Sequence, residues 1–134
     1  MTAPMSLEDL FHEIADRVLE EFIDIVDDAR IQFTSSGAVK CLRIFLRDGS
    51  FVDVWLSFTG KYSYHWEHRH LNGFLYRHDN APHRRWDRIE TFPKHFHDGS
   101  EENVMVSYIS DEPREAVREF LRFIRSKLGV RSET

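Results

Sequence analysis

In the stretch CLRIFLRDGSFVDVWL, residues 41–56, aliphatic residues occupy every second position on each side of a central Asp48-Gly49 pair. A period of two places successive side chains on opposite faces of a strand. Asp-Gly between two such runs is a strong signal for the turn of a β-hairpin. This stretch therefore predicts two antiparallel strands that share one apolar face. The apolar positions are Leu42, Ile44, Leu46, Val52, Val54 and Leu56.

The same alternation continues outward from this hairpin in both directions. Gly37, Gly60 and Gly73 lie in the turn-like sequences between the runs, as expected where a chain reverses. The pattern predicts an antiparallel β-meander sheet of about six strands. The expected strands are residues 29–34, 41–46, 51–58, 62–67, 74–77 and 104–109.

Both ends of the chain show helical spacing instead. Ser6 is suited to cap a first helix, along which apolar residues recur every three or four positions as far as Ile25. A second such pattern follows Pro113 and ends near Gly129. Each helix must bury its apolar stripe, and the economical arrangement packs both on one face of the sheet. Residues 1–134 are thus expected to form a single α+β domain.

Composition narrows the class of protein. The 134 residues are 41% hydrophobic and 31% charged, which suits a folded domain with its own core. Cys41 is the single cysteine, so an intramolecular disulfide and a cysteine-based zinc finger are both excluded. The sequence shows no signal peptide and no apolar run of about 18 residues. A cytoplasmic protein with no membrane association is expected.

Charge and histidine are distributed unevenly. The net charge is −5, yet residues 61–97 hold seven Lys or Arg against four acids, and seven of the eight histidines. A locally positive segment on an acidic body can concentrate an anionic ligand, although uneven scatter is also common in small proteins. Residues 78–102 lack a sustained period and contain two prolines. A long irregular segment inside a small domain is often functional.

Three motifs lie in this region: Tyr-His-Trp at 64–66, Asp-Asn-Ala-Pro-His at 79–83 and Thr-Phe-Pro-x-His-x-His at 91–97. In this order they resemble the TumE-like family, whose members are toxin components of bacterial and archaeal toxin–antitoxin pairs. The resemblance extends over most of the chain and implies a cognate antitoxin protein as partner. Arg84 and Lys94 stand where members commonly carry further histidines, which weakens any model that needs a histidine there.

The residues themselves favour chemistry on RNA. A metal-independent ribonuclease needs a base, an acid and cationic groups around the phosphate, and histidine suits both proton roles near neutral pH. We therefore expect cleavage without a cofactor or metal. The catalytic candidates are His65, Asp79, His83, His95 and His97. The binding candidates are Tyr64, Trp66, Arg77, Asn80, Arg84, Arg85 and Lys94, which offer stacking surfaces, hydrogen bonds or positive charge.

Several alternatives stay open. The aromatic residues can instead fill the core, and His65 can simply pair with Glu67. A metal-dependent hydrolase would use the cluster of His83, His95 and His97, and either His83 or Asp79 can complete the site with the other two histidines. A toxin that binds a protein or nucleic acid without cleaving it would use the same segment for recognition. The sequence leaves the oligomeric state open, and a homo-oligomer is compatible with it.

Overall fold

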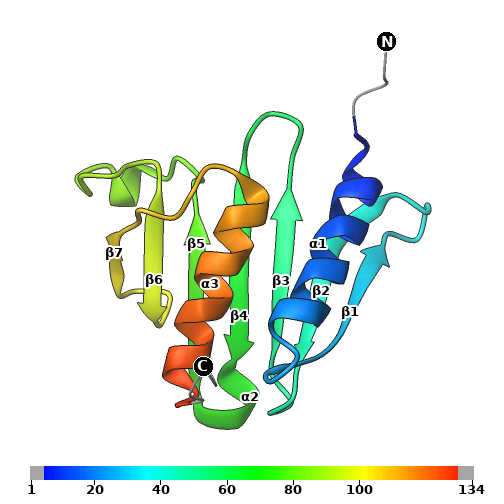
Figure 1. The fold of residues 1–134 in the computed structure, drawn as a ribbon. Coiled ribbons are helices and arrows are strands. Elements are labelled where there is room, and N and C mark those ends of the chain that lie inside the picture. Colours follow the sequence, from blue (N-terminus) through cyan, green and yellow to red (C-terminus); the bar gives the residue numbers. More distant parts are fainter. Residues whose placement is uncertain (1–4, 130–134) are drawn as a thin grey trace.

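Seven antiparallel strands form one sheet, and their order in space follows their order along the chain (Figure 1). The computed structural model describes residues 5–129, so residues 1–4 and 130–134 of the expected domain lie outside the described residues. The strands are β1 (Val26–Phe33), β2 (Val39–Leu46), β3 (Phe51–Leu56), β4 (Tyr62–His68), β5 (Phe74–Asp79), β6 (His95–Gly99) and β7 (Val104–Val106).

The predicted α+β meander is confirmed, but the sheet has seven strands where about six are expected from the sequence. The additional strand is β6, within the segment 78–102 that the sequence analysis treats as irregular. The alternation is present there, because His95 and His97 face one side of the sheet and Phe96 faces the other. The sequence pattern does not indicate this strand, because the side chains that alternate with Phe96 are imidazoles and not aliphatic groups.

Both long helices lie on the same side of the sheet, as Figure 1 shows, which confirms the predicted layering. Helix α1 (Leu7–Glu21) begins after Ser6, whose hydroxyl accepts a hydrogen bond from the Asp9 amide at 3.0 Å. Helix α3 (Pro113–Lys127) begins after Glu112 and has Pro113 in its first turn. Two short elements, α2 (Arg69–Asn72) and the 3-10 helix η1 (Arg84–Trp86), lie between strands. Within residues 5–129 no helix has both the length and the apolar character of a membrane span.

The strand periodicity separates two faces of the sheet. On β4, Tyr62, Tyr64 and Trp66 point into the core beneath the helices and are buried. The intervening side chains of β4 therefore point to the opposite face, which carries no long helix and is called the open face below. Trp86 of η1, in the segment 80–94, lies against His95 and His97 of β6 on this open face. The fold thus places polar side chains of several strands side by side on one surface.

Candidate functional site

A row of directly opposed polar residues runs across the open face. The strand register pairs Arg43 with Asp53, Asp53 with His65, and so on to His97 on β6. Residues opposed in neighbouring strands lie close enough for their side chains to interact. The row consists of Arg43, Asp53, His65, Arg77 and His97, one from each of β2 to β6. Strand register therefore brings the first residues of the site side by side.

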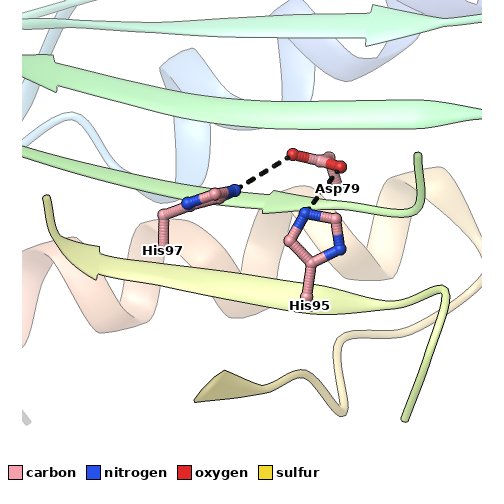
Figure 2. A group of neighbouring side chains, drawn as sticks. All are labelled: Asp79, His95 and His97. Carbon is pink, nitrogen blue, oxygen red and sulfur yellow. Dashed lines mark ion pairs between the residues drawn. The ribbon is translucent and has the colours of Figure 1, made fainter. Parts of the chain in front are cut away.

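At its β6 end, this row meets a cluster of two imidazoles and one carboxylate. Asp79 lies directly opposite His95 in the β5–β6 register. The Nε2 atom of His95 is 3.0 Å from Oδ1 of Asp79, and Nε2 of His97 is 3.6 Å from Oδ2. Figure 2 shows both rings, which rise from the same strand, pointing toward this carboxylate. The side chains of His95 and His97 are only 1% and 4% exposed, so the cluster is almost closed to solvent.

Backbone carbonyl groups fix the orientation of both rings. His95 donates from Nδ1 to the Pro93 carbonyl at 2.8 Å, and His97 donates from Nδ1 to the Glu101 carbonyl at 2.9 Å. A carbonyl oxygen only accepts, so each Nδ1 must carry a hydrogen. Each Nε2 atom is therefore the one that faces Asp79.

The surroundings of Asp79 and His95 favour opposite charges on these two residues. Burial by itself raises the pKa of Asp79, but the close contacts with the imidazoles of His95 and His97 outweigh it and hold that pKa far below its usual range. Burial by itself lowers the pKa of His95, but the contacts with Asp79 and the Pro93 carbonyl outweigh it and raise that pKa. The folded structure thus favours a negative charge on Asp79 and a positive charge on His95.

Beside the cluster, the open face is hollowed. The hollow has a volume of about 320 Å³ and draws on β5, the segment 80–94, β6 and the turn after β6. Its lining combines guanidinium groups, imidazoles, carboxylates and one indole, a mixture suited to an anionic ligand with a flat aromatic part. The lining residues are Arg77, Asp79, His83, Arg85, Trp86, His97 and Glu101.

Another hollow, of about 310 Å³, lies between the start of α1 and the turn after β3. Its lining is largely apolar, with Leu7, Leu10 and Leu56 among its members, and it contains no histidine. The chemistry that the sequence predicts is therefore concentrated in the hollow on the open face.

Five of the predicted site residues line that hollow: Arg77, Asp79, His83, Arg85 and His97. His95 lies behind it as the most deeply buried member of the cluster. Trp86 and Glu101 complete the lining, and neither is among the candidate residues predicted from the sequence. No motif marks Glu101, because its position depends on the turn that connects β6 to β7.

His65 occupies a different position from the one expected of a free base. Its Nδ1 faces Nη1 of Arg77 at 3.3 Å, and its Nε2 faces Oε1 of Glu67 at 3.3 Å. Arg77 only donates, so Nδ1 accepts and Nε2 carries the hydrogen. Burial is the main cause that lowers the pKa of His65. This ring is held between two partners, which matches the structural interpretation of His65 given above.

Tyr64 and Trp66 are predicted binding residues, but the structure places both in the core. They are 1% and 3% exposed, on the face of β4 beneath the helices. The Nε1 atom of Trp66 donates to the hydroxyl of Ser50 at 2.9 Å, and its ring stacks on Tyr76. The alternation of β4 points them away from His65, so they cannot touch a ligand on the open face.

Three further binding candidates lie outside the lining of the hollow. Lys94 donates to the carbonyl of Ile109 and contacts Asp111, so it ties the loop to the segment before α3. Asn80 accepts from the Tyr62 amide and donates to the Gly60 carbonyl, which anchors the loop to the β3–β4 turn. Arg84 is exposed on η1 without lining the hollow.

Fold and site together define a small α+β protein with a histidine- and arginine-lined hollow on the helix-free face of a meander sheet. Comparison with protein families identifies it further, because residues 10–128 match the family model described as Toxin TumE. The match covers most of the chain, so the chain belongs to the TumE family of toxins. None of the curated proteins and none of the solved structures compared matches it.

Proposed function

We propose that the protein is the toxin component of a toxin–antitoxin system and that it cleaves RNA at the hollow on the open face. Membership of the TumE family supports the toxin role and an antitoxin partner. The observation that carries the RNA proposal is the lining of the hollow, where Arg77 and Arg85 meet His83 and His97. Arginine is well suited to phosphate, and Trp86 offers a surface on which an unpaired base can stack.

The sequence predicts a route without metal. In this route one imidazole removes the proton from a 2′-hydroxyl, and the oxygen attacks the adjacent phosphorus. The bond from phosphorus to the 5′-oxygen then breaks, and a second imidazole protonates the departing oxygen. The products are a 2′,3′-cyclic phosphate and a 5′-hydroxyl. His83, which is exposed, and His97, at the inner wall, are the two histidines that line the hollow.

A metal-dependent hydrolase is the second candidate, and the burial of the cluster favours it. A general acid or base must reach the proton that it transfers, whereas His97 is 4% exposed and His95 is 1% exposed. Such groups are poorly placed to touch RNA directly but are well placed to hold an ion that does. The ligand atoms of Asp79, His95 and His97 all lie within 4.8 Å of one another.

Purified protein without a polyhistidine tag, incubated with end-labelled RNA, tests the proposal. We expect cleavage, and we expect His83→Ala and His97→Ala to reduce its rate by about 100-fold or more, in the range that general acid–base groups contribute. His12→Ala, which removes an exposed histidine on α1, is the matched control and should cleave normally. Reactions in EDTA and in added divalent metal separate the two routes.

Intact RNA under every metal condition would overturn the proposal. The toxin would then act by binding alone, and substitution of the hollow's histidines would leave its effect on growth unchanged. The antitoxin is expected to cover the segment 80–94, where Arg84, Arg85 and Arg88 concentrate positive charge. Protection of this segment from hydrogen exchange in the toxin–antitoxin complex would support that arrangement. A homo-oligomer stays a prediction.

A further inference from the structure

Asp79, His95 and His97 have the composition and the arrangement of a metal site. Two imidazoles and one carboxylate form a common ligand set for divalent transition metals, including Zn²⁺ in hydrolases. His95 and His97 lie two residues apart on β6, so both point to the same face of the sheet (Figure 2). The antiparallel register then places Asp79 of β5 directly opposite His95. Two adjacent strands thus supply three potential ligands.

The distances fit ligands that share an ion. Bonds of about 2.0–2.2 Å to a tetrahedral ion separate two ligand atoms by about 3.3–3.6 Å, and adjacent ligands of an octahedral ion lie about 3.0 Å apart. Oδ1 of Asp79 is 3.0 Å from Nε2 of His95, and Oδ2 of Asp79 is 3.6 Å from Nε2 of His97. All three ligand atoms lie within 4.8 Å. These separations place the three groups close enough to share one ion.

The groups around the cluster have the role of outer-shell partners. In metal sites, a ligating histidine generally donates its other ring nitrogen to a carbonyl or carboxylate, and ligating carboxylates are themselves hydrogen-bonded. Both Nδ1 atoms donate to backbone carbonyls here, which leaves each Nε2 lone pair for a metal when the ring is neutral. Asp79 accepts from Nε of Arg77 at 3.0 Å and from the Ala81 amide at 3.0 Å. Hydrogen bonds to groups outside the ligand set therefore fix the orientation of all three potential ligands.

One buried atom gives independent support. Nε2 of His95 has no hydrogen-bond partner among residues 5–129, although Oδ1 of Asp79 is only 3.0 Å away. The contact is short enough but has the wrong direction for a hydrogen bond. A buried polar atom without a partner is unfavourable and requires an explanation. Two ligands of one ion have this relationship, because their lone pairs point at the ion and not at each other.

We propose that Asp79, His95 and His97 bind one divalent transition-metal ion, of the class to which Zn²⁺ belongs, through a carboxylate oxygen and two Nε2 atoms. Asp79 and His97 also line the hollow, so an ion held by them would lie at its inner wall. Three protein ligands with an open position are typical of catalytic sites, whereas structural sites are closed by four. The inference rests on the proposed function for its role and specifies the metal-dependent route, in which His97 is a ligand of the ion and not the general acid or base.

Titration of the metal-stripped, tag-free protein with Zn²⁺ in a calorimeter tests the binding directly. We expect one ion per chain and at least a 10-fold loss of affinity in Asp79→Asn and in His97→Gln. His83→Gln and His12→Gln each remove one histidine outside the proposed ligand set and should bind as the wild type does. The absence of stoichiometric binding by the wild type would overturn the proposal. Equal loss in His83→Gln would overturn the ligand assignment.

A second measurement needs no substitution, in case a variant fails to fold. Long-range ¹H–¹⁵N spectra of wild-type protein report both nitrogens of every imidazole. Addition of Zn²⁺ should shift Nε2 of His95 and His97 while their Nδ1 atoms stay protonated. Zn²⁺ should also raise the unfolding temperature, because the folded state alone contains the assembled site. Unchanged imidazole signals would show that the cluster is instead a hydrogen-bonded imidazole–carboxylate group.

The failure of this inference is distinguishable from the failure of the proposed function. Zn²⁺ binding without RNA cleavage under any condition would retain the metal site and remove the ribonuclease. Cleavage that persists in EDTA, together with the absence of Zn²⁺ binding, would retain the ribonuclease and remove the metal. Cleavage that EDTA abolishes and Zn²⁺, Mn²⁺ or Co²⁺ restores would support both.

Discussion

Arg77 and Glu101 form a two-pronged ion pair, in which Nη1 and Nη2 of the guanidinium each lie 2.7 Å from a carboxylate oxygen. A phosphate would use the same face of the guanidinium, because both anions accept two parallel hydrogen bonds from it. The backbone carbonyl of Glu101 also accepts from His97. Glu101 therefore limits access to the charge of Arg77 and, through its main chain, orients an imidazole of the site.

The first prediction follows from this pairing. Glu101→Gln removes the competing charge but keeps the carbonyl that holds His97. Single-stranded RNA should then bind about 3- to 10-fold more tightly at low salt. The slope of log Kd against log salt should steepen by about 0.7, the value for one more phosphate contact on a single strand. Fluorescence polarisation at several salt concentrations measures both quantities.

Glu102 provides the matched control for that experiment. Glu102→Gln removes the same charge one residue away, from an exposed side chain that forms no ion pair within residues 5–129. Its effect on RNA binding should be small. If the two substitutions change affinity equally, general electrostatics explains the result and Arg77 is not a phosphate ligand.

The second prediction concerns Trp66 and Trp55, two of the three tryptophans, which the sheet places on opposite faces. Trp66→Ala should lower the free energy of unfolding by about 3–5 kcal/mol, because it removes a large buried side chain. Trp55, on the open face and 42% exposed, is the control, and Trp55→Ala should change stability by less than about 1 kcal/mol. Urea denaturation measures both. Equal effects would contradict the placement of Trp66 in the core.

Much of the fold was predictable from the sequence, because its signals are local. The alternation around Asp48-Gly49 identifies the central hairpin, and the helical spacing after Ser6 and Pro113 identifies both helices. The missed strand, β6, carries two histidines at its inward positions on the open face. A strand is recognised in a sequence by apolar residues at every second position. Because His95 and His97 occupy those positions of β6, the residues that supply the chemistry of the site also hide the strand pattern.

The site was predictable in composition but not in geometry. Histidine content and motifs indicate His83, His95 and His97, while the partner of each ring depends on strand register and on the turn after β6. Register assigns Asp79 to His95 and pairs His65 with Arg77. Nothing in the sequence next to His95 or His65 shows that one faces a carboxylate and the other a guanidinium. Pairing across strands decides their chemistry.

The third prediction is a pH dependence of stability. Hydrogen bonding to Arg69 is the main cause that lowers the pKa of Glu67, from 4.5 to about 2. A carboxylate whose pKa is lowered by folding stabilises the protein above its unfolded pKa and loses that contribution as the pH falls through the folded value. Stability should therefore fall between about pH 4.5 and pH 2. Glu67→Gln should remove about 1 kcal/mol of this fall, because Arg69 is 53% exposed and solvent screens the pair.

Thermal unfolding at half-unit steps of pH, at low and at high salt, measures this effect. Glu90→Gln removes an exposed acid and serves as the control, with a profile parallel to that of the wild type. A Glu67→Gln profile that stays parallel to the wild type across the same range would contradict the prediction.

The fourth prediction separates a structural lysine from a ligand. The Nζ atom of Lys94 is 2.5 Å from the carbonyl of Ile109 and 3.1 Å from Oδ1 of Asp111. Lys94→Met keeps the length of the side chain and removes these contacts, so it should lower stability by about 1–2 kcal/mol. The salt dependence of RNA binding should not change. A shallower salt slope would show that Lys94 contacts phosphate after all.

The last prediction uses two neighbouring arginines of η1 as an internal comparison. Arg85 lines the hollow and its guanidinium lies 4.7 Å from the centre of the Trp86 ring, whereas Arg84 lies outside the lining. Arg84→Ala and Arg85→Ala each remove one positive charge from the same exposed turn. Arg85→Ala should weaken RNA binding by about 3- to 10-fold and reduce the salt slope by about 0.7, the loss of one phosphate contact. Arg84→Ala should act only through long-range attraction and change affinity by less than about 2-fold. Equal losses would mean that RNA responds to the charge of the loop and does not enter the hollow.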